Sequence, residues 1–127
     1  MIDKSAKLTI GDNVELRRSL EIRVHQSSEV KIDSNVRIDR GVRILGTNQA
    51  IIHLKEGVRV GLYSVFNGGD SISVGEKCLI SGFVYLQTSM HGFKDKSMNV
   101  QAQGYDHAPV VLENDCWLGT HVVVLPG

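Results

Sequence analysis

Residues 72–86 read ISVGEKCLISGFVYL, with an aliphatic residue at every sixth position: Val74, Ile80 and Leu86. A smaller apolar residue follows four positions after the first two of these, at Cys78 and Val84. All five positions are even-numbered, so extended backbone places them on one face, whereas an α-helix at about 100° per residue scatters them around its cylinder. The stretch therefore predicts short β-strands with one buried face.

The same pattern returns along the whole chain, which makes it an internal repeat. Successive copies are separated by 22, 22, 20 and 38 residues, which equal 18 plus insertions of 4, 4, 2 and 20. Three sides of six residues make such a coil, so we predict an all-β fold, a triangular parallel solenoid of about five coils around a continuous aliphatic ladder. The copies begin at Leu8, Val30, Ile52, Ile72 and Val110.

The largest insertion predicts one long protruding loop at about residues 88–108. Its composition is mostly polar, with Lys94, Asp95 and Lys96 in succession. Connections of this length are uncommon in a compact domain and are usually functional or mobile. We therefore expect this loop to be either functional or mobile.

Length and composition limit the class of protein. With 127 residues, the chain is expected to be a single domain, 1–127. Fourteen basic and fourteen acidic residues give no net charge, which argues against nucleic-acid partners, and no apolar run is long enough for membrane insertion. The first residues contain no apolar signal core, so the expected location is cytoplasmic. Cys78 and Cys116 should stack in the core as two thiols.

The charged residues are unevenly distributed along the chain. Residues 1–60 carry a net charge of +3, and residues 61–127 carry −3. An offset of 22 residues stacks Arg18 against Arg40 and Arg37 against Arg59. A solvated face explains this distribution, and a patch for an anionic substrate is the alternative.

Three features together resemble a known family: the hexads, the segment Leu86–His91 before the insertion, and the return over residues 108–127, APVVLENDCWLGTHVVVLPG. They are similar to the hexapeptide-repeat acyltransferases, and most to the galactoside and maltose O-acetyltransferase branch. The resemblance implies a left-handed parallel β-helix, acetyl-CoA as co-substrate, and a homotrimer with its sites at subunit interfaces. It also implies transfer of an acetyl group to a hydroxyl of a sugar or saccharide-like acceptor.

His91 matches the family's catalytic base. A histidine titrates near neutral pH, so it can be both unprotonated and basic enough to take a proton from an acceptor hydroxyl. The hydroxyl oxygen would then attack the thioester of acetyl-CoA. We therefore predict that His91 is the general base.

The resemblance assigns other residues to binding. Asn67 and Asp70 would hold the acceptor, although they also suit a tight turn, and Val65 occupies the place where the family has its asparagine. Trp117 lies at an outward position and would contact both the acceptor and the thioester. The backbone at Gly119 and Thr120 would line the groove for coenzyme A.

Other functions on this scaffold stay open to different degrees. A zinc-dependent carbonic anhydrase of the γ type needs a closely spaced histidine pair, but successive histidines here are 28, 38, 16 and 14 residues apart, so no metal is expected. N-acetylation of an amino-sugar nucleotide or an antibiotic is the alternative reaction, because a histidine base serves both. A non-catalytic hexapeptide scaffold is the alternative outside enzymology.

The fifth coil reaches its third side only at Val124. Members of the family continue into a further coil and a cap, and an uncapped solenoid exposes strand edges and apolar residues. We therefore expect the C-terminal end to be truncated, with weaker binding of the nucleotide end of coenzyme A as a consequence.

Overall fold

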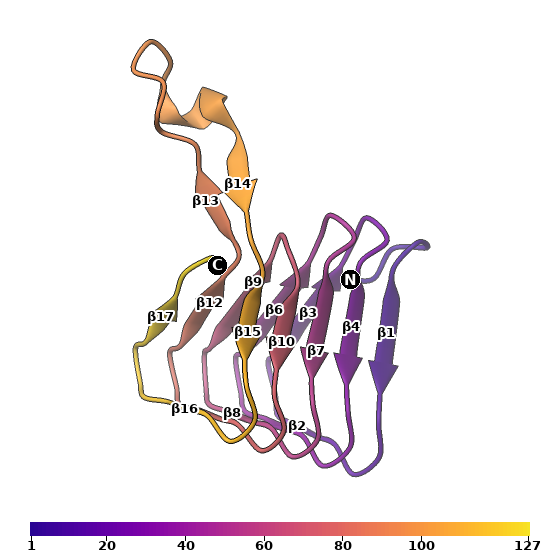
Figure 1. The fold of residues 1–127 in the computed structure, drawn as a ribbon. Helices are drawn as coiled ribbons and strands as arrows, with labels where there is room; N and C mark the ends of the chain where they lie inside the picture. Colours follow the sequence, from indigo (N-terminus) through magenta and orange to yellow (C-terminus); the bar gives the residue numbers. More distant parts are fainter.

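The computed structural model describes residues 1–127 as a parallel β-solenoid with three faces (Figure 1). Each face is a sheet of five parallel strands, one from each coil. The first sheet contains β1 (Lys7–Ile10), β4 (Glu29–Ile32), β7 (Ile51–Leu54), β10 (Ile72–Val74) and β15 (Val110–Leu112). The second contains β2 (Glu15–Leu16), β5 (Arg37–Ile38), β8 (Arg59–Val60), β11 (Leu79–Ile80) and β16 (Trp117–Leu118). The third contains β3 (Glu21–Val24), β6 (Arg43–Gly46), β9 (Val65–Gly68), β12 (Tyr85–Gln87) and β17 (Val123–Val124). This confirms the predicted β-helix.

The even-numbered residues form the core, as the hexads predict. In the third sheet, parallel pairing stacks Ile22, Ile44, Phe66, Leu86 and Val124 in one ladder across all five strands. The three central members are at most 1% exposed. The two outer members are partly buried and pack against the central cluster. Each coil thus buries its apolar side chains on those of its neighbours, as in other repeat proteins.

The corner between the second and third sheets has left-handed backbone in every coil. The residues there are Ser19, Gly41, Tyr63, Phe83 and His121, with φ between 54° and 68°. The rings of the last three residues stack outside the solenoid. The centroids of Tyr63 and Phe83 are 5.6 Å apart, and those of Phe83 and His121 are 5.1 Å apart. Asparagine and glycine favour this conformation, whereas a bulky residue adopts it only where surrounding structure fixes it.

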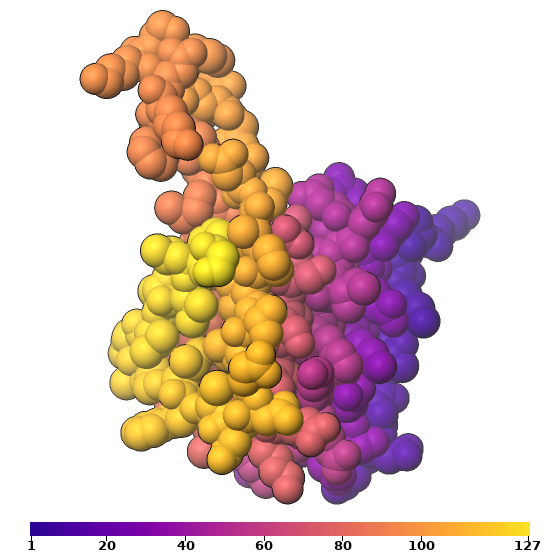
Figure 2. Space-filling view, in the orientation of Figure 1, coloured from indigo at the N-terminus to yellow at the C-terminus, as the bar shows by residue number.

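The predicted loop is an ordered hairpin. It leaves the corner between the third and first sheets and consists of β13 (Ser89–His91), the short 3₁₀ helix η1 (Val100–Gln103) and β14 (Tyr105–His107), with β13 and β14 antiparallel. The Asn99 side chain accepts a hydrogen bond from the Ala102 amide and so caps η1. Figure 2 shows the hairpin standing clear of the solenoid.

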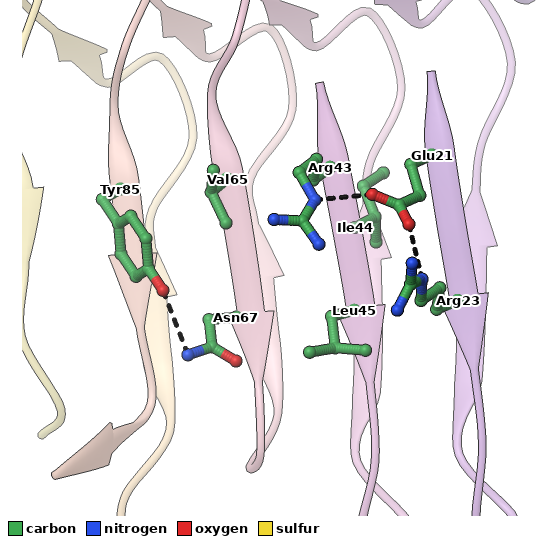
Figure 3. Close-up of a pocket in the computed structure, with 8 residues that line it drawn as sticks. All are labelled: Glu21, Arg23, Arg43, Ile44, Leu45, Val65, Asn67 and Tyr85. Atoms are coloured by element: carbon green, nitrogen blue, oxygen red, sulfur yellow. Dashed lines mark hydrogen bonds and ion pairs between the residues drawn. The ribbon is translucent and has the colours of Figure 1, made fainter. Parts of the chain in front are cut away.

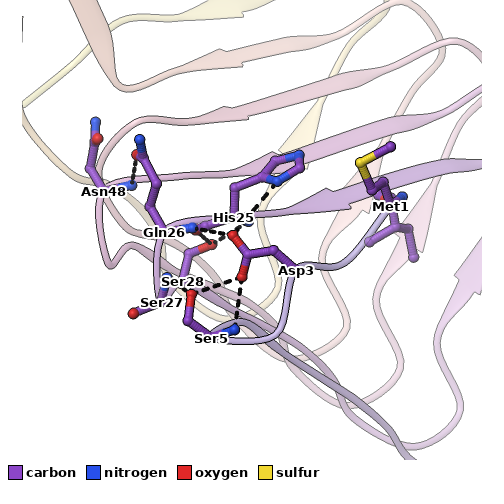
Figure 4. A network of polar contacts seen from close by, with 9 residues as sticks. Met1, Asp3, Ser5, His25, Gln26, Ser27, Ser28 and Asn48 are labelled. Carbon is purple, nitrogen blue, oxygen red and sulfur yellow. Dashed lines mark hydrogen bonds and ion pairs between the residues drawn. The ribbon is translucent and has the colours of Figure 1, made fainter.

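Polar contacts fix the N-terminal segment to the turn between the first and second coils (Figure 4). One Asp3 carboxylate oxygen accepts a hydrogen bond from the Gln26 amide at 2.9 Å, and the other accepts from the Ser5 hydroxyl at 2.8 Å. These donors lower the pKa of Asp3. The Gln26 side chain in turn accepts a hydrogen bond from the Asn48 amide, which links the network to the third coil.

Two further expectations concern the cysteines and membrane-spanning segments. Cys78 and Cys116 are free thiols in neighbouring coils, with Cys78 buried and Cys116 half-buried. The Cys78 thiol donates to the Glu113 carbonyl at 2.9 Å. None of the helical structure has the length and apolar character needed to cross a membrane.

Candidate active site

The root of the hairpin is held by one buried hydroxyl. Thr88 is fully buried after β12, and its Oγ1 donates to the Asn67 carbonyl at 2.7 Å and accepts from the Asp70 amide at 2.9 Å. Its own carbonyl accepts from the Ala108 amide, where the chain returns to the solenoid. The two hairpin strands therefore leave and re-enter the solenoid at a fixed position.

One face of the hairpin carries four side chains capable of chemistry. The antiparallel register pairs Ser89 with His107 and His91 with Tyr105, so alternation places all four on the same side. The Ser89 hydroxyl and His107 Nδ1 are 2.8 Å apart. The His91 and Tyr105 ring centroids lie 4.2 Å apart, and those of Tyr105 and His107 lie 6.1 Å apart. The three rings thus form a row along the hairpin, with the serine at its root.

A groove of about 450 Å³ lies between this hairpin face and the neighbouring corner. Gly69 also lines it, and any side chain there would collide first with the Ser89 hydroxyl and then with the ring of His107, because a Cβ would be 3.0 Å from Nδ1. The Asn48 amide group donates to the Gly69 carbonyl at 3.2 Å. The lining offers hydroxyl, amide and imidazole groups but no charged side chain: Thr47, Asn48, Asn67, Gly69, Ser89, Tyr105 and His107. Such a surface suits a neutral polyhydroxylated or amino-bearing molecule.

Asn67 also belongs to a second, smaller hollow of about 110 Å³ on the outer face of the third sheet (Figure 3). There its amide group donates to the Tyr85 hydroxyl at 3.2 Å. Glu21 lies at the other end between Arg23 and Arg43, and the Arg43 guanidinium lowers the pKa of this carboxyl group. Asn67 therefore lines both the groove and this smaller hollow.

The structure brings together only some of the residues expected to form the site. His91 is exposed on the same hairpin face and pairs with Tyr105, which lines the groove, but His91 itself does not line it; Asn67 does. Asp70 does not line it, because its carboxylate accepts from the Ser71 amide at 2.6 Å and serves the corner. Asn67 lies within strand β9, one residue before its end, instead of in a turn.

Trp117, Gly119 and Thr120 lie elsewhere in the chain. Trp117 is on the second sheet, 74% exposed, and its Nε1 donates to the Ser81 hydroxyl at 3.2 Å. Thr120 lies at the corner between the second and third sheets and donates to the Gly82 carbonyl. The hairpin leaves the solenoid at a different corner. Within the chain, Trp117, Gly119 and Thr120 therefore do not share a corner with the hairpin.

Sequence reasoning missed Ser89, Tyr105 and His107. The available signal was the alternation in SMH and YDH, residues 89–91 and 105–107, which places every second residue on one face once the segments are known to pair. No group of three or more His, Cys, Asp or Glu side chains lies close enough together to hold a metal ion.

The sequence matches no protein-family model and no curated protein. Two solved structures resemble the fold, both of mutants of AntD, an N-acyltransferase from Bacillus cereus. One is in complex with dTDP and coenzyme A, with a TM-score of 0.73 and 17% identity. The other is in complex with dTDP-4-amino-4,6-dideoxyglucose and coenzyme A, with a TM-score of 0.71 and 20% identity. In both cases the match covers 93% of this chain and 63% of the other. The chain therefore shares its solenoid architecture with AntD over nearly all of its own length.

Proposed function

We propose that the protein is an acyltransferase that moves an acetyl group from acetyl-CoA to a sugar-like acceptor. The observation that carries this proposal is the polar groove at the hairpin root, where the exposed imidazoles of His91 and His107 lie on the same hairpin face. Support comes from the likeness to AntD, whose structures contain coenzyme A together with dTDP or a dTDP-linked amino sugar. The uncharged lining fits the sugar part of such a molecule.

In the proposed mechanism, His91 acts as the general base. Its ring is exposed and lies against Tyr105, which fixes the plane of the imidazole beside the groove. The neutral imidazole takes the proton of the acceptor hydroxyl or amine as the oxygen or nitrogen attacks the thioester carbonyl. A backbone amide stabilises the resulting oxyanion, and the thiolate of coenzyme A leaves as the tetrahedral intermediate collapses. No covalent bond to the enzyme forms.

The proposed assembly is a homotrimer with shared sites. Trp117, Gly119 and Thr120 lie away from the hairpin, so one chain would supply the base while its neighbour supplies the surface for coenzyme A. Trp117 is 74% exposed, as expected for an aromatic residue that another subunit or a ligand covers. An enzymatically active monomer in light scattering would contradict this arrangement.

The acceptor atom can be the oxygen of a hydroxyl or the nitrogen of an amine, which gives two candidate reactions. The resemblance to galactoside and maltose O-acetyltransferases favours a hydroxyl, whereas the likeness to AntD favours an amine. We keep the sugar hydroxyl as the first candidate and the amine of an amino-sugar nucleotide as the second. Acetyl-CoA turnover against matched pairs, each a sugar and its amino-sugar counterpart, distinguishes the two reactions directly.

Two histidine variants test the base. We expect His91→Ala to lower kcat by about 10²–10⁴-fold while binding of acetyl-CoA by calorimetry is retained. His107→Ala should act mainly through acceptor KM, because His107 lines the groove and its Nδ1 lies against the Ser89 hydroxyl. His53→Asn is the control, since His53 pairs with Asp33 on the first sheet. Turnover at the wild-type rate in His91→Ala would reject the mechanism. Failure of the wild-type protein to bind acetyl-CoA would favour a non-catalytic scaffold.

A further inference from the structure

A further hollow, distinct from the groove and from the small hollow at Asn67, lies at the corner between the second and third sheets. It measures about 530 Å³ and contains no apolar side chain. Its lining consists of four arginines and one aspartate: Arg17, Arg18, Arg37, Asp39 and Arg40. We refer to it as the arginine hollow. Because the whole protein has no net charge, this concentration of positive charge is local.

The backbone forces these arginines together. Glu15 pairs with Arg37 in register, and the Arg17 amide donates to the Ile38 carbonyl at 3.0 Å. The Gly41 amide donates to the Arg18 carbonyl at 3.2 Å, so the corner after β2 stacks directly on the corner after β5. Neighbouring coils are about 4.8 Å apart, which brings the backbones of Arg18 and Arg40 to about that distance from one another.

Acidic side chains neutralise only part of this charge. Glu15 pairs with both Arg17 and Arg37. Asp39 uses one carboxylate oxygen to accept from the Arg40 amide at 2.7 Å. Neither Arg18 nor Arg40 has an ion pair or a side-chain hydrogen bond, and both side chains are exposed. Arg18 and Arg40 occupy equivalent positions in neighbouring coils, and both keep their guanidinium donors free of ion pairs and hydrogen bonds.

An aromatic edge borders the hollow. The Arg40 guanidinium carbon lies 6.0 Å from the ring centroid of Tyr63 in the next coil, and Phe83 stacks beyond Tyr63. Between these coils the corner has bare backbone at Gly61, where a Cβ would be 2.5 Å from the Gly82 nitrogen. Gly61 therefore packs directly on the backbone of the next coil, and the aromatic edge itself consists of the exposed rings of Tyr63 and Phe83.

We propose that the arginine hollow binds a diphosphate group, through the free guanidinium groups of Arg18 and Arg40. Guanidinium groups bind phosphate oxygens through two parallel hydrogen bonds, and two adjacent groups match two adjacent phosphates. The diphosphate can be free inorganic pyrophosphate or part of a nucleoside diphosphate. The hollow is separate from the proposed acyl-transfer groove, since the third sheet lies between the two corners.

Calorimetric titration of the full chain with inorganic pyrophosphate tests the proposal. Arg18→Gln/Arg40→Gln should weaken pyrophosphate binding at least tenfold, which corresponds to the loss of one or more charge-assisted hydrogen bonds. Arg18→Lys/Arg40→Lys keeps the charge but loses the paired donors, so its affinity for pyrophosphate should lie between those of the wild type and the double glutamine variant. The matched control is Arg23→Gln/Arg43→Gln, which removes the same charge from the third sheet and should bind like the wild type.

A second titration identifies the source of the diphosphate. ADP that binds more tightly than pyrophosphate supports a nucleotide whose base meets the aromatic edge, and equal affinities support a free diphosphate. His107→Ala should leave both affinities unchanged, so a defect in acyl transfer is distinguishable from a defect here. Absence of pyrophosphate binding to the wild type, or equal weakening in the Arg23→Gln/Arg43→Gln control, overturns the proposal. Circular dichroism and thermal melting of each variant exclude unfolding as the cause.

Discussion

Replacement of Thr88 by valine tests how the hairpin is held. The two side chains have nearly the same volume, so the change removes a hydroxyl from a fully buried position without opening a cavity. The Asn67 carbonyl keeps one partner, the Thr88 amide at 3.2 Å, whereas the Asp70 amide loses the acceptor that lay 2.9 Å away. A buried donor left without a partner costs about 1–3 kcal/mol. Together with the lost bond to the Asn67 carbonyl, we expect a loss of about 2–3 kcal/mol in the free energy of unfolding.

Thr88→Ser is the matched control, because it keeps the hydroxyl and removes only one buried methyl group, at a cost of about 1 kcal/mol. Urea unfolding followed by circular dichroism measures both variants, and an unchanged m-value shows that the same surface unfolds. Hydrogen exchange at the Ala108 amide, which donates to the Thr88 carbonyl, reports the hairpin root itself. A valine variant as stable as the serine variant would refute the idea that this hydroxyl positions the hairpin.

Three further predictions concern the core, the hairpin tip and the buried thiol. Phe66→Ala should cost about 3–5 kcal/mol by urea unfolding because Phe66 is fully buried at mid-solenoid, whereas Leu118→Ala in the last coil, where the side chain is only partly buried, should cost clearly less. Hydrogen bonds from the Ser97 hydroxyl and amide lower the pKa of Asp95. The order they give the tip is therefore present above the unfolded pKa and lost as pH falls through the folded pKa, so the protection factor of the Ser97 amide, measured relative to intrinsic exchange, should fall below about pH 4. The same protection factor should show no such fall in Asp95→Asn. Burial raises the pKa of the Cys78 thiol, so iodoacetamide at pH 8 should modify it much more slowly than in urea-unfolded protein; equal rates would show that the core opens readily.

The fold was predictable because burial in a solenoid depends on parity alone. Ile44, Phe66 and Leu86 occupy equivalent even positions, and in-register pairing of the coils stacks them. The outward position of Trp117 followed from the same count. No arrangement of distant segments had to be guessed, since each coil contacts only its neighbours.

The site was harder to predict because it depends on the one segment outside the repeat. Ser89 and His107 are 18 residues apart and meet only through the antiparallel register of the hairpin, which no periodicity encodes. The role of Thr88 was hidden for another reason: it occupies an inward position where the repeat prescribes an apolar side chain, and its hydroxyl is useful only because two backbone groups of the neighbouring coil face it. His91 and Trp117 lie on the hairpin and on the second sheet, so the repeat pattern does not bring them together within the chain.

The left-handed corners change the usual effect of glycine. An L-residue in this conformation costs roughly 1–2 kcal/mol, so the backbone at Tyr63 and Phe83, with φ of 54° and 58°, carries a strain that ring stacking offsets. Gly41 occupies the equivalent place one coil earlier without that strain. A glycine substitution, which destabilises most strands, is thus nearly neutral here. Backbone hydrogen bonds between coils, such as the one from the Tyr63 amide to the Arg40 carbonyl, preserve the solenoid when a ring on this edge is removed, whereas a side chain added at Gly41 would force the Tyr63 ring to move.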